Sequence, residues 1–376
     1  MDVTIAPHHE ELRHTLTEVL DDELAPLIRR MADRPRHGTD TSDADVRAMV
    51  WRALTDLGVL RMPGGAGGHE ALAVVAERLG ELLYQGPLLD TVLAAETLLR
   101  SRTCPERDRL LKEIADGTSV AAAVRDGDPH PEDGALTVGA ADDTVSAVRR
   151  FVTCAAEADW LLVTGRTPEG EHRTALLPRD HPTVRLRRQE ELGRGETYAV
   201  ELAATPVLAW LDLGPDPVAV WQRLAASART LQAAYLVGLA AGALRLAVEH
   251  ARERRQFGGP IGRQQSLAFT LARHATRIDA ARLLTRVAAR EADTGDDPRL
   301  SAAQAYAMAA ELAKEASRDS VQIHGARGLT LDCEAQLFLR RSAVESLALG
   351  APNRVRADVL PLLLASAASR RVRGER

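Results

Sequence analysis

The chain has 376 residues, with 48 basic and 53 acidic side chains and a formal net charge of −5. This acidic balance lacks the basic excess of a nucleic-acid-binding surface, so we expect no nucleic acid among the partners. Aromatic residues make up only 3% of the chain, so aliphatic side chains and alanine must build the core of the two or three domains that this length allows.

The cysteines and the first residues indicate a reduced, cytoplasmic protein. Cys104, Cys154 and Cys333 lie far apart, no pair has metal-ligand spacing, and an odd number does not suit a disulfide framework. We therefore expect three buried or reduced thiols and no metal site. The opening MDVTIAPHHEELRH is charged and contains no apolar segment of the kind that a secretion signal requires.

Residues 1–117 are predicted to form an N-terminal helical domain. Leucine and isoleucine recur at helical spacing over 7–34, and Ser42 and Asp43 can cap a second helix that runs to Leu57. The glycines of LGVLRMPGGAGGHE then interrupt the helical pattern. Further helices are expected over three segments, 71–84, 87–100 and 106–116.

The composition changes at about residue 118, where short β-branched runs begin to alternate with Gly, Asp and Pro. This alternation predicts a small β-barrel or β-sandwich over 118–217. From residue 218 the pattern is again helical, in long segments near 218–255, 264–294, 300–324, 332–348 and 354–368. The segments predict a C-terminal four-helix bundle over 218–368, followed by a basic tail at 369–376.

The most apolar stretch runs from Leu231 to Val248. Because Gln232 and Arg245 interrupt it, we interpret it as a buried bundle helix and expect no membrane span. The stretch contains GLAAG, whose glycines are four residues apart, and small residues at this spacing allow close helix packing. The fold class expected from the whole pattern is α+β, with helices, a small β domain and a bundle in that order.

The motif HARERRQFGGPIGRQQ, at 250–265, places arginines at a helix end, then a glycine pair, a proline and a new helix. A guanidinium fixed beside an exposed aromatic ring suits a pyrophosphate that is joined to a planar ring. From spacing alone, we favour a simpler interpretation, a surface helix end at which Gly258 and Gly259 form the C-cap.

The motif also resembles the acyl-CoA dehydrogenase signature Arg-x-x-Phe-Gly-x-x-Ile-x-x-x-Gln, with Arg254, Phe257, Gly258, Ile261 and Gln265 at the matching offsets. The resemblance implies that Arg254 binds the pyrophosphate of FAD. It further implies that Phe257 and Gln265 lie along the cofactor, which is held mainly by the neighbouring subunit.

A second segment, VQIHGARGLT, resembles the family's Gln-x-x-Gly-Gly-x-Gly motif and adds Gln322 and Gly325 to the implied FAD contacts. Ala326 replaces the second glycine, so the backbone there either approaches a ligand less closely or takes an ordinary conformation. His324 has two interpretations: it carries a proton or, as we favour, it serves in packing at the helix end.

In the β domain, VRRFVTCAAEADWLLV resembles the family's Lys-x-Phe-Ile-Thr segment, with Arg149 at the lysine position. The resemblance places Thr153 near the flavin ring. The family's Thr-Glu-Pro-x-x-Gly-Ser-Asp segment, which wraps flavin and thioester, has no counterpart in RDGDPHPEDG at 125–134. The half of the FAD site that belongs to this subunit therefore departs from the family pattern, whereas the half donated to a neighbour is retained.

The family uses a glutamate to remove the α-proton of an acyl-CoA while hydride passes to the flavin. One usual position of this base holds Leu349, and the other, directly before Arg229, holds Ala228. The catalytic base is therefore unknown, and Arg229 is expected to orient substrate or to hold the start of its helix. Glu345 is a possible substitute, but we favour a solvated or paired surface carboxylate at this position.

Four functions stay open from the sequence. The chain is an FAD-dependent dehydrogenase of an acyl thioester with a displaced base, or the base-less subunit of a heteromeric one; these two are favoured. The others are a flavin monooxygenase and a non-catalytic scaffold. The expected partners are an acyl-CoA or acyl-carrier-protein substrate and either a homodimer or homotetramer or a second acyl-CoA dehydrogenase-like subunit.

Overall fold

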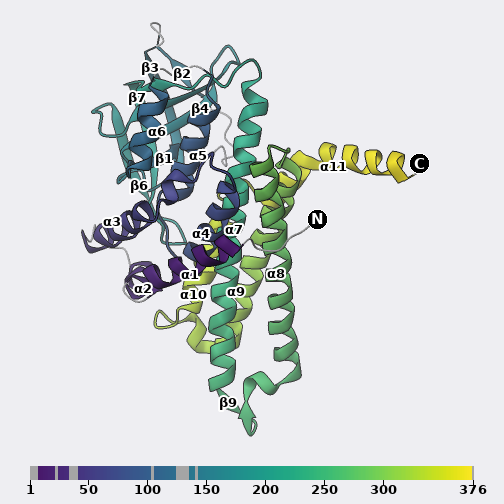
Figure 1. Cartoon of the computed structure of the whole chain (residues 1–376). Coiled ribbons are helices and arrows are strands. Elements are labelled where there is room, and N and C mark those ends of the chain that lie inside the picture. The colour runs from purple at the N-terminus through teal and green to yellow at the C-terminus, as the bar shows by residue number, and fades with distance from the viewer. Residues whose placement is uncertain are drawn as a thin grey trace.

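The computed structural model describes residues 7–21, 24–33, 41–102, 106–123, 135–139 and 143–374. Helical segments precede and follow the β domain along the chain, in the order expected for the α+β class (Figure 1). Cys154 and Cys333 are buried free thiols, as predicted, whereas Cys104 lies outside the described residues. The segment 125–134, in which the FAD-wrapping sequence is replaced, also lies outside them.

The N-terminal part consists of helices, some of which lie against the β domain and others against the C-terminal helices (Figure 1). Their bounds are α1 (Pro7–Asp21), α2 (Ala25–Asp33), α3 (Thr41–Asp56), the 3₁₀ turn η1 (Val59–Arg61), α4 (Gly68–Glu81), α5 (Leu88–Arg100) and α6 (Arg107–Ala115). The helical stretch expected over 7–34 is divided into α1 and α2. The sequence did not predict this division, because the apolar periodicity continues across the junction between the two helices.

The β domain is a sandwich of two four-stranded sheets. One has the order β1-β4-β5-β8 and the other β2-β3-β7-β6. The bounds are β1 (Val120–Ala123), β2 (Thr137–Val138), β3 (Thr144–Thr153), β4 (Trp160–Arg166), β5 (His172–Pro178), β6 (Val184–Gln189), β7 (Thr197–Pro206) and β8 (Ala209–Trp210). Strand β1 pairs in parallel with β4, and the other pairs in the two sheets are antiparallel.

The first of these sheets is buried on both faces. Leu161 and Val163 point into the space between the sheets, whereas the alternate residue Leu162 packs in a second cluster with Leu98 of α5 and Ile114 of α6. Figure 1 shows α5 and α6 lying over this side of the sandwich. The double burial explains why the β4 segment is a continuous apolar run rather than an alternating one.

The C-terminal bundle contains α7 (Pro217–Glu253), α8 (Gln265–Thr294), α9 (Arg299–His324), α10 (Ala335–Glu345) and α11 (Pro352–Gly374). Asp216 caps α7 by accepting a hydrogen bond from the amide of Ala219 at 3.0 Å, and Pro217 occupies the first helical position. Helix α11 projects from the bundle (Figure 1) and continues beyond the predicted bundle end at 368, to Gly374.

Helix α7 forms the centre of the bundle. Of the described helices, it alone is long and apolar enough to cross a membrane, and 72% of its most apolar window is buried inside the structure. That burial is typical of a core helix. A Cβ atom on Gly238 would lie 2.0 Å from the carbonyl oxygen of Glu77 in α4, so the GLAAG segment allows α4 and α7 to cross closely, as predicted.

A polar cluster joins α4, α5 and α8. The Nε2 atom of His69 lies 2.9 Å from Glu96 Oε1, and its Nδ1 atom lies 2.9 Å from Asp293 Oδ1. Asp293 also accepts hydrogen bonds from the first amides of α4, on His69 and Glu70. Although burial lowers the pKa of His69, the two carboxylates raise it by more, to about 10. His69 is therefore a buried cation that ties three helices together.

Candidate functional site

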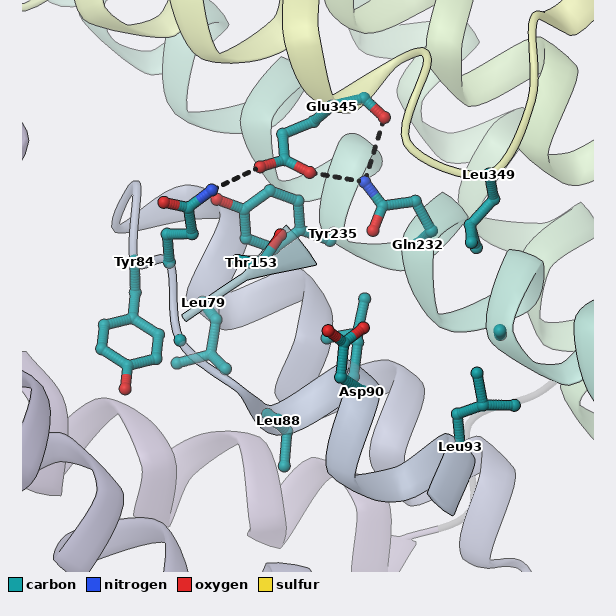
Figure 2. Close-up of a pocket in the computed structure, with 14 residues that line it drawn as sticks. Leu79, Tyr84, Leu88, Asp90, Leu93, Thr153, Gln232, Tyr235, Glu345 and Leu349 are labelled. Carbon is teal, nitrogen blue, oxygen red and sulfur yellow. Dashed lines mark hydrogen bonds between the residues drawn. The ribbon is translucent and has the colours of Figure 1, made fainter. Parts of the chain in front are cut away.

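A narrow pocket lies where the α4–α5 connection, the end of β3, the middle of α7 and the end of α10 meet (Figure 2). It encloses about 50 Å³. Leucines and the ring of Tyr235 form much of its wall, and Thr153, Asp90 and Glu345 bring polar groups to it. This composition, largely apolar with a few convergent polar groups, is that of a small-molecule site.

The two positions that resemblance assigns to a catalytic base both line this pocket. Ala228 comes from α7, and Leu349 comes from the turns that follow α10. They are 121 residues apart in sequence, so their convergence is a property of the fold. The described wall therefore offers no carboxylate at either usual position.

Glu345 is a carboxylate in the same wall, and our surface interpretation of it is wrong. Its side chain is buried, with 7% of the residue exposed. Its Oε1 atom accepts a hydrogen bond from Gln85 Nε2 at 3.2 Å, and its Oε2 atom accepts one from Gln232 Nε2 at 3.0 Å (Figure 2). The prediction that this carboxylate is paired agrees with the structure, but the pair lies inside the protein and not on its surface.

Arg341 supports this carboxylate from behind. Its Nη1 atom lies 3.7 Å from Glu345 Oε1, and only 3% of the residue is exposed. Burial lowers the pKa of the Arg341 guanidinium, but facing acidic groups, Glu345 among them, raise it by more. Arg341 therefore stays charged and balances the buried glutamate.

The segment that carries Leu349 is fixed by polar contacts on both sides. Arg229 donates from Nε to the carbonyl oxygen of Leu349 at 3.3 Å. Tyr306, from α9, donates through its hydroxyl to the carbonyl oxygens of Ser346 and Gly350, both at 3.0 Å. Because α7 begins at Pro217, Arg229 does not hold the start of its helix, which corrects one of its two predicted roles. Burial lowers its pKa.

Thr153 reaches the pocket because β3 is irregular. The pairing of β3 with β7 shifts between Arg149 and Val152, and Phe151 has a φ of 55° at this irregularity. A bulge of this kind re-aims the side chains that follow it. Thr153 is buried and lines the pocket opposite α10, the side on which the resemblance places a flavin ring.

Arg149, at the family's lysine position, is a structural residue. Only 2% of it is exposed, and its guanidinium donates to the carbonyl oxygens of Ala123 at 3.1 Å and Thr164 at 2.7 Å. It also bonds the carbonyl oxygens of Ala135 and Val148. The side chain thus joins β1, β3 and β4 and does not line the pocket.

The first signature motif forms a hairpin at the far tip of the bundle (Figure 1). Strands β9 (Arg255–Gln256) and β10 (Gly259–Pro260) pair around a two-residue turn, in which Phe257 has a φ of 51° and Gly258 a φ of 83°. Positive φ at both central residues defines a type I′ turn. The glycine C-cap that spacing favoured is therefore wrong, because α7 ends at Glu253 and Arg254 is extended.

This turn leaves Phe257 92% exposed. Gln265 begins α8 directly behind the hairpin and is exposed, as is Arg254 at the end of α7. An aromatic ring, an amide and a guanidinium are thus presented together on the surface. These are the groups that a planar ring and a pyrophosphate would contact.

The second motif lies beside the first. Arg254 and Gly325 both line a hollow of about 520 Å³, to which His250 and His324 also contribute. Gly325 has φ 63° and ψ −143°, which only glycine adopts without strain, whereas Ala326 takes an ordinary backbone conformation. Gln322, in the last turn of α9, is exposed.

His324 takes the helix-end role that we favoured. Its Nδ1 atom lies 2.8 Å from the carbonyl oxygen of Ser320, one turn earlier in α9. Its ring stacks on that of His250, with the ring centroids 4.4 Å apart. Burial, the facing His324 and the nearby Arg327 and Arg254 all lower the pKa of His250. The lining of the hollow also includes the guanidinium groups of Arg254 and Arg327 and the carboxylate of Glu253, so the two arginines are the groups that suit an anionic ligand.

The hairpin at 255–260 with the adjoining ends of α7, α8 and α9, here called the tip, lies far from the pocket in space. Helix α7 carries Ala228 in the pocket wall and continues to Glu253 beside the hairpin, a distance of roughly 40 Å at 1.5 Å per residue. The structure therefore brings Thr153, Ala228 and Leu349 together in the pocket. Separately, Arg254 and Gly325 line one hollow, Phe257 and Gln265 lie in the adjoining hairpin and at the start of α8, and Gln322 lies in the last turn of α9.

Three polar residues of the pocket were not singled out from sequence, namely Gln85, Gln232 and Asp90. Gln85 and Gln232 hold Glu345, and Gln85 also accepts the amide of Glu196 at 2.8 Å through its Oε1 atom. No local motif marks these residues. Gln232 alone had a signal, because an amide within the apolar stretch of α7 requires a buried partner.

Comparison with known proteins identifies the family. Residues 218–361 match the family described as acyl-CoA dehydrogenase, C-terminal domain. Acyl-CoA dehydrogenase FadE12 of Mycobacterium tuberculosis is 30% identical over 290 residues, which cover 71% of this chain and 73% of that protein. Acyl-CoA dehydrogenase IpdE2 of Mycolicibacterium smegmatis is 29% identical over 361 residues, 93% of this chain and 96% of its own.

Solved structures confirm the fold. A chain of the ChsE4–ChsE5 complex from Mycobacterium tuberculosis aligns with a TM-score of 0.81 at 23% identity, over 97% of this chain and 99% of that one. Butyryl-CoA dehydrogenase from Megasphaera elsdenii aligns with a TM-score of 0.83 at 20% identity, over 97% and 100% of the two chains. Together with both signature motifs at one surface, these matches show that the chain belongs to the acyl-CoA dehydrogenase family of flavoprotein oxidoreductases.

Proposed function

We propose that the protein is a subunit of an FAD-dependent dehydrogenase that oxidises the α,β-bond of an acyl thioester, with each FAD shared between two chains. The observation that supports this proposal most strongly is the separation of the tip from the pocket, roughly 40 Å along α7. Residues of the tip cannot reach a ligand in their own pocket. They are placed to contact a flavin held in the pocket region of a second chain.

The described residues fit FAD on the donating side, and Thr153 offers one contact on the receiving side. On the donating side, Arg254 would bind the pyrophosphate, Phe257 and Gln265 would lie along the cofactor, and Gln322 and Gly325 would lie beside them. On the receiving side, Thr153 would face the flavin ring, next to the acyl pocket. The bound flavin would supply the hydride acceptor.

The second chain is either another copy or a different acyl-CoA dehydrogenase-like subunit. Leu349 and Ala228 leave both usual base positions of this pocket without a carboxylate, and in a heteromer the other chain would have a glutamate at one of these positions in its own pocket. The aligned chain with this fold comes from the ChsE4–ChsE5 complex. An α₂β₂ assembly would keep the closed symmetry that oligomers usually adopt.

The first experiment is the visible absorption spectrum of the chain purified alone, together with its mass in solution. A flavin band near one FAD per chain, with the mass of a dimer or tetramer, is the result expected for a homomer. A band that appears only after co-expression with a second dehydrogenase-like chain is the result expected for a heteromer. A colourless protein in both preparations would overturn the proposal and favour a non-catalytic scaffold.

Tip variants test which residues hold the flavin. Arg254→Gln and Phe257→Ala should each lower the FAD content and leave the bundle folded, because both residues are exposed. Arg245→Gln is the matched control, since it removes a positive charge from the exposed face of the same helix, at a site paired with Glu249. Equal loss of FAD in this control would contradict a specific role of the tip.

Turnover assays on the yellow protein separate the two flavin chemistries. Reduction of an artificial electron acceptor by an acyl-CoA, with loss of two hydrogens from the acyl chain, is expected for the dehydrogenase. Consumption of oxygen with insertion of oxygen into the substrate would instead assign the protein to the monooxygenases.

A further inference from the structure

We propose that Glu345 is the catalytic base of this chain's own pocket and removes the α-proton of the acyl thioester. The inference rests on the proposed function, because it requires a thioester in the pocket. It differs from the family pattern, in which the glutamate stands at the positions held here by Leu349 and Ala228. The proposed base, Glu345, lies four residues before Leu349 in the sequence.

The location of Glu345 carries the first step of the argument. Glu345 lines the same cavity as Leu349 and Ala228, so its carboxylate enters the space that either usual base would enter. Leu349 lies in the turns that begin where α10 ends at Glu345, so the two residues come from one short segment. Figure 2 shows the Glu345 carboxylate above Thr153 and the ring of Tyr235, with Gln232 beside it.

The partners of Glu345 carry the second step. Its two oxygen atoms accept hydrogen bonds from side-chain amides, and Arg341 lies 3.7 Å behind one of them. These groups hold the carboxylate in place. Gln85 and Gln232 are themselves fixed by second hydrogen bonds, because Gln85 accepts the amide of Glu196 and Gln232 donates to the carbonyl oxygen of Glu345.

Asp90 is the rival carboxylate in the same wall. Its Oδ2 atom accepts a hydrogen bond from the backbone amide of Ala122 at 3.0 Å, which fixes it to β1. A backbone amide cannot turn to accept a proton from a newly formed carboxylic acid. Asp90 is therefore suited to joining α5 and β1, whereas the carboxylate of Glu345 is held by the side chains of Gln85, Gln232 and Arg341.

The proposed step is a balanced proton transfer. A Glu345 carboxylate oxygen forms a bond to the proton as the Cα–H bond of the thioester breaks. The electron pair stays on the substrate as the enolate of the thioester, and the protonated glutamate later releases its proton to water. In the absence of an electron acceptor the transfer reverses, so a label at the α-carbon is exchanged with solvent.

Exchange of that label is the test. Acetyl-, propionyl- and butyryl-CoA carrying deuterium at the α-carbon are incubated with the protein in water, with and without added FAD, and deuterium loss is followed by mass spectrometry. The wild-type protein should exchange at least one of these probes. Glu345→Gln, which keeps the size of the side chain, should slow exchange on the order of 10²–10⁴-fold, the usual contribution of a positioned base.

Three further variants keep the test decisive if the first is poorly folded. Glu345→Gln combined with Leu349→Glu returns a carboxylate to the family's usual position and should restore exchange. Asp108→Asn, at a side chain that is 92% exposed and outside the pocket, is the control and should retain exchange within a few fold of wild type. Asp90→Asn tests the rival carboxylate, and thermal unfolding is measured for every variant. Exchange lost in Asp90→Asn but kept in Glu345→Gln would overturn the inference, and so would a wild-type protein that exchanges none of the probes.

The outcome is separable from that of the proposed function. A flavin band and an oligomeric mass report on the shared FAD site, and neither depends on Glu345. Exchange that survives Glu345→Gln in a yellow, assembled protein would overturn the base assignment alone. Exchange that depends on Glu345 in a protein that never binds FAD would support the base assignment and overturn the proposed function.

Discussion

Phe257 shows how a single residue can be placed for a ligand at the expense of local stability. A bulky side chain at φ 51° is uncommon, because its Cβ atom crowds the backbone, and strain of this kind costs on the order of 1–3 kcal/mol. Nothing in the described chain compensates by packing, since the ring is 92% exposed. This combination of strain and exposure is what the proposed contact of the ring with a flavin held by another chain would require.

Replacing Phe257 with asparagine tests this account. Asparagine tolerates the left-handed region, so the free energy of unfolding of the FAD-free chain should rise by up to about 1 kcal/mol. The FAD content should fall, because the exposed ring is lost. Urea unfolding and the absorption spectrum measure the two effects. A variant that is destabilised while it keeps its FAD would contradict the account.

Strand β3 is held to its neighbours by a buried cation. The guanidinium of Arg149 bonds backbone oxygens of β1, β3 and β4, near the irregularity that directs Thr153 into the pocket. A buried carbonyl group that loses its donor costs about 1–3 kcal/mol. Several such groups depend on this one side chain, so the shape of the strand beside the pocket depends on it too.

Arg149→Met should therefore lower the free energy of unfolding by about 3 kcal/mol or more, since methionine fills the space but donates no hydrogen bond. Arg187→Met, on an exposed position of β6, is the control and should change stability by no more than about 0.5 kcal/mol. Urea unfolding of both variants gives the comparison. A similar loss in the free energy of unfolding for both variants would contradict the structural role of Arg149.

At the scale of the whole molecule, His69 couples the N-terminal helices to the bundle. It lies between Glu96 of α5 and Asp293 of α8, and its pKa is raised from 6.5 to about 10. Folded and unfolded chains both carry the proton below pH 6.5, so the ion pairs contribute fully there. Between pH 6.5 and 10 only the folded chain keeps the proton, and folding becomes coupled to its uptake.

The free energy of unfolding should therefore fall as the pH rises from 6.5 to 10, by a few kcal/mol at about 1.4 kcal/mol for each unit of pKa shift. His69→Gln should be less stable than wild type at pH 6.5 and should lose most of this dependence. His14→Gln, at a side chain that is 75% exposed, should retain it. Urea unfolding across this range measures both slopes, and equal slopes would refute the coupling.

Most helices and strands could be predicted from the local sequence, because the hydrophobic periodicity that marks each of them lies within its own segment. The helix expected over 300–324 is α9, Arg299–His324, and the apolar run at 160–163 is the doubly buried β4. The end of α10 did not follow, since the prediction ran to 348 and the helix ends at Glu345. The turns after it are held by Tyr306, from another helix.

The site was predictable only where it carries a motif. Arg254, Phe257 and Gln265 are fixed by spacing within one segment, and the structure gathers them at one tip. The burial of Glu345 depends on Gln85 and Gln232, which are 260 and 113 residues away. A carboxylate on a helix end appears exposed in sequence, and only the tertiary contacts place it inside the pocket.

The length of α7 has a genetic consequence for an assembly in which copies of this chain share FAD with one another. A substitution at the tip damages the catalytic centre of the neighbour, whereas a substitution in the pocket wall damages the chain's own centre. Two inactive alleles, one altered at Arg254 and one at Glu345, would therefore complement each other. In a mixed oligomer, some interfaces join an intact tip to an intact pocket. A tip allele would also be partly dominant over wild type, because it is incorporated beside functional chains and silences them.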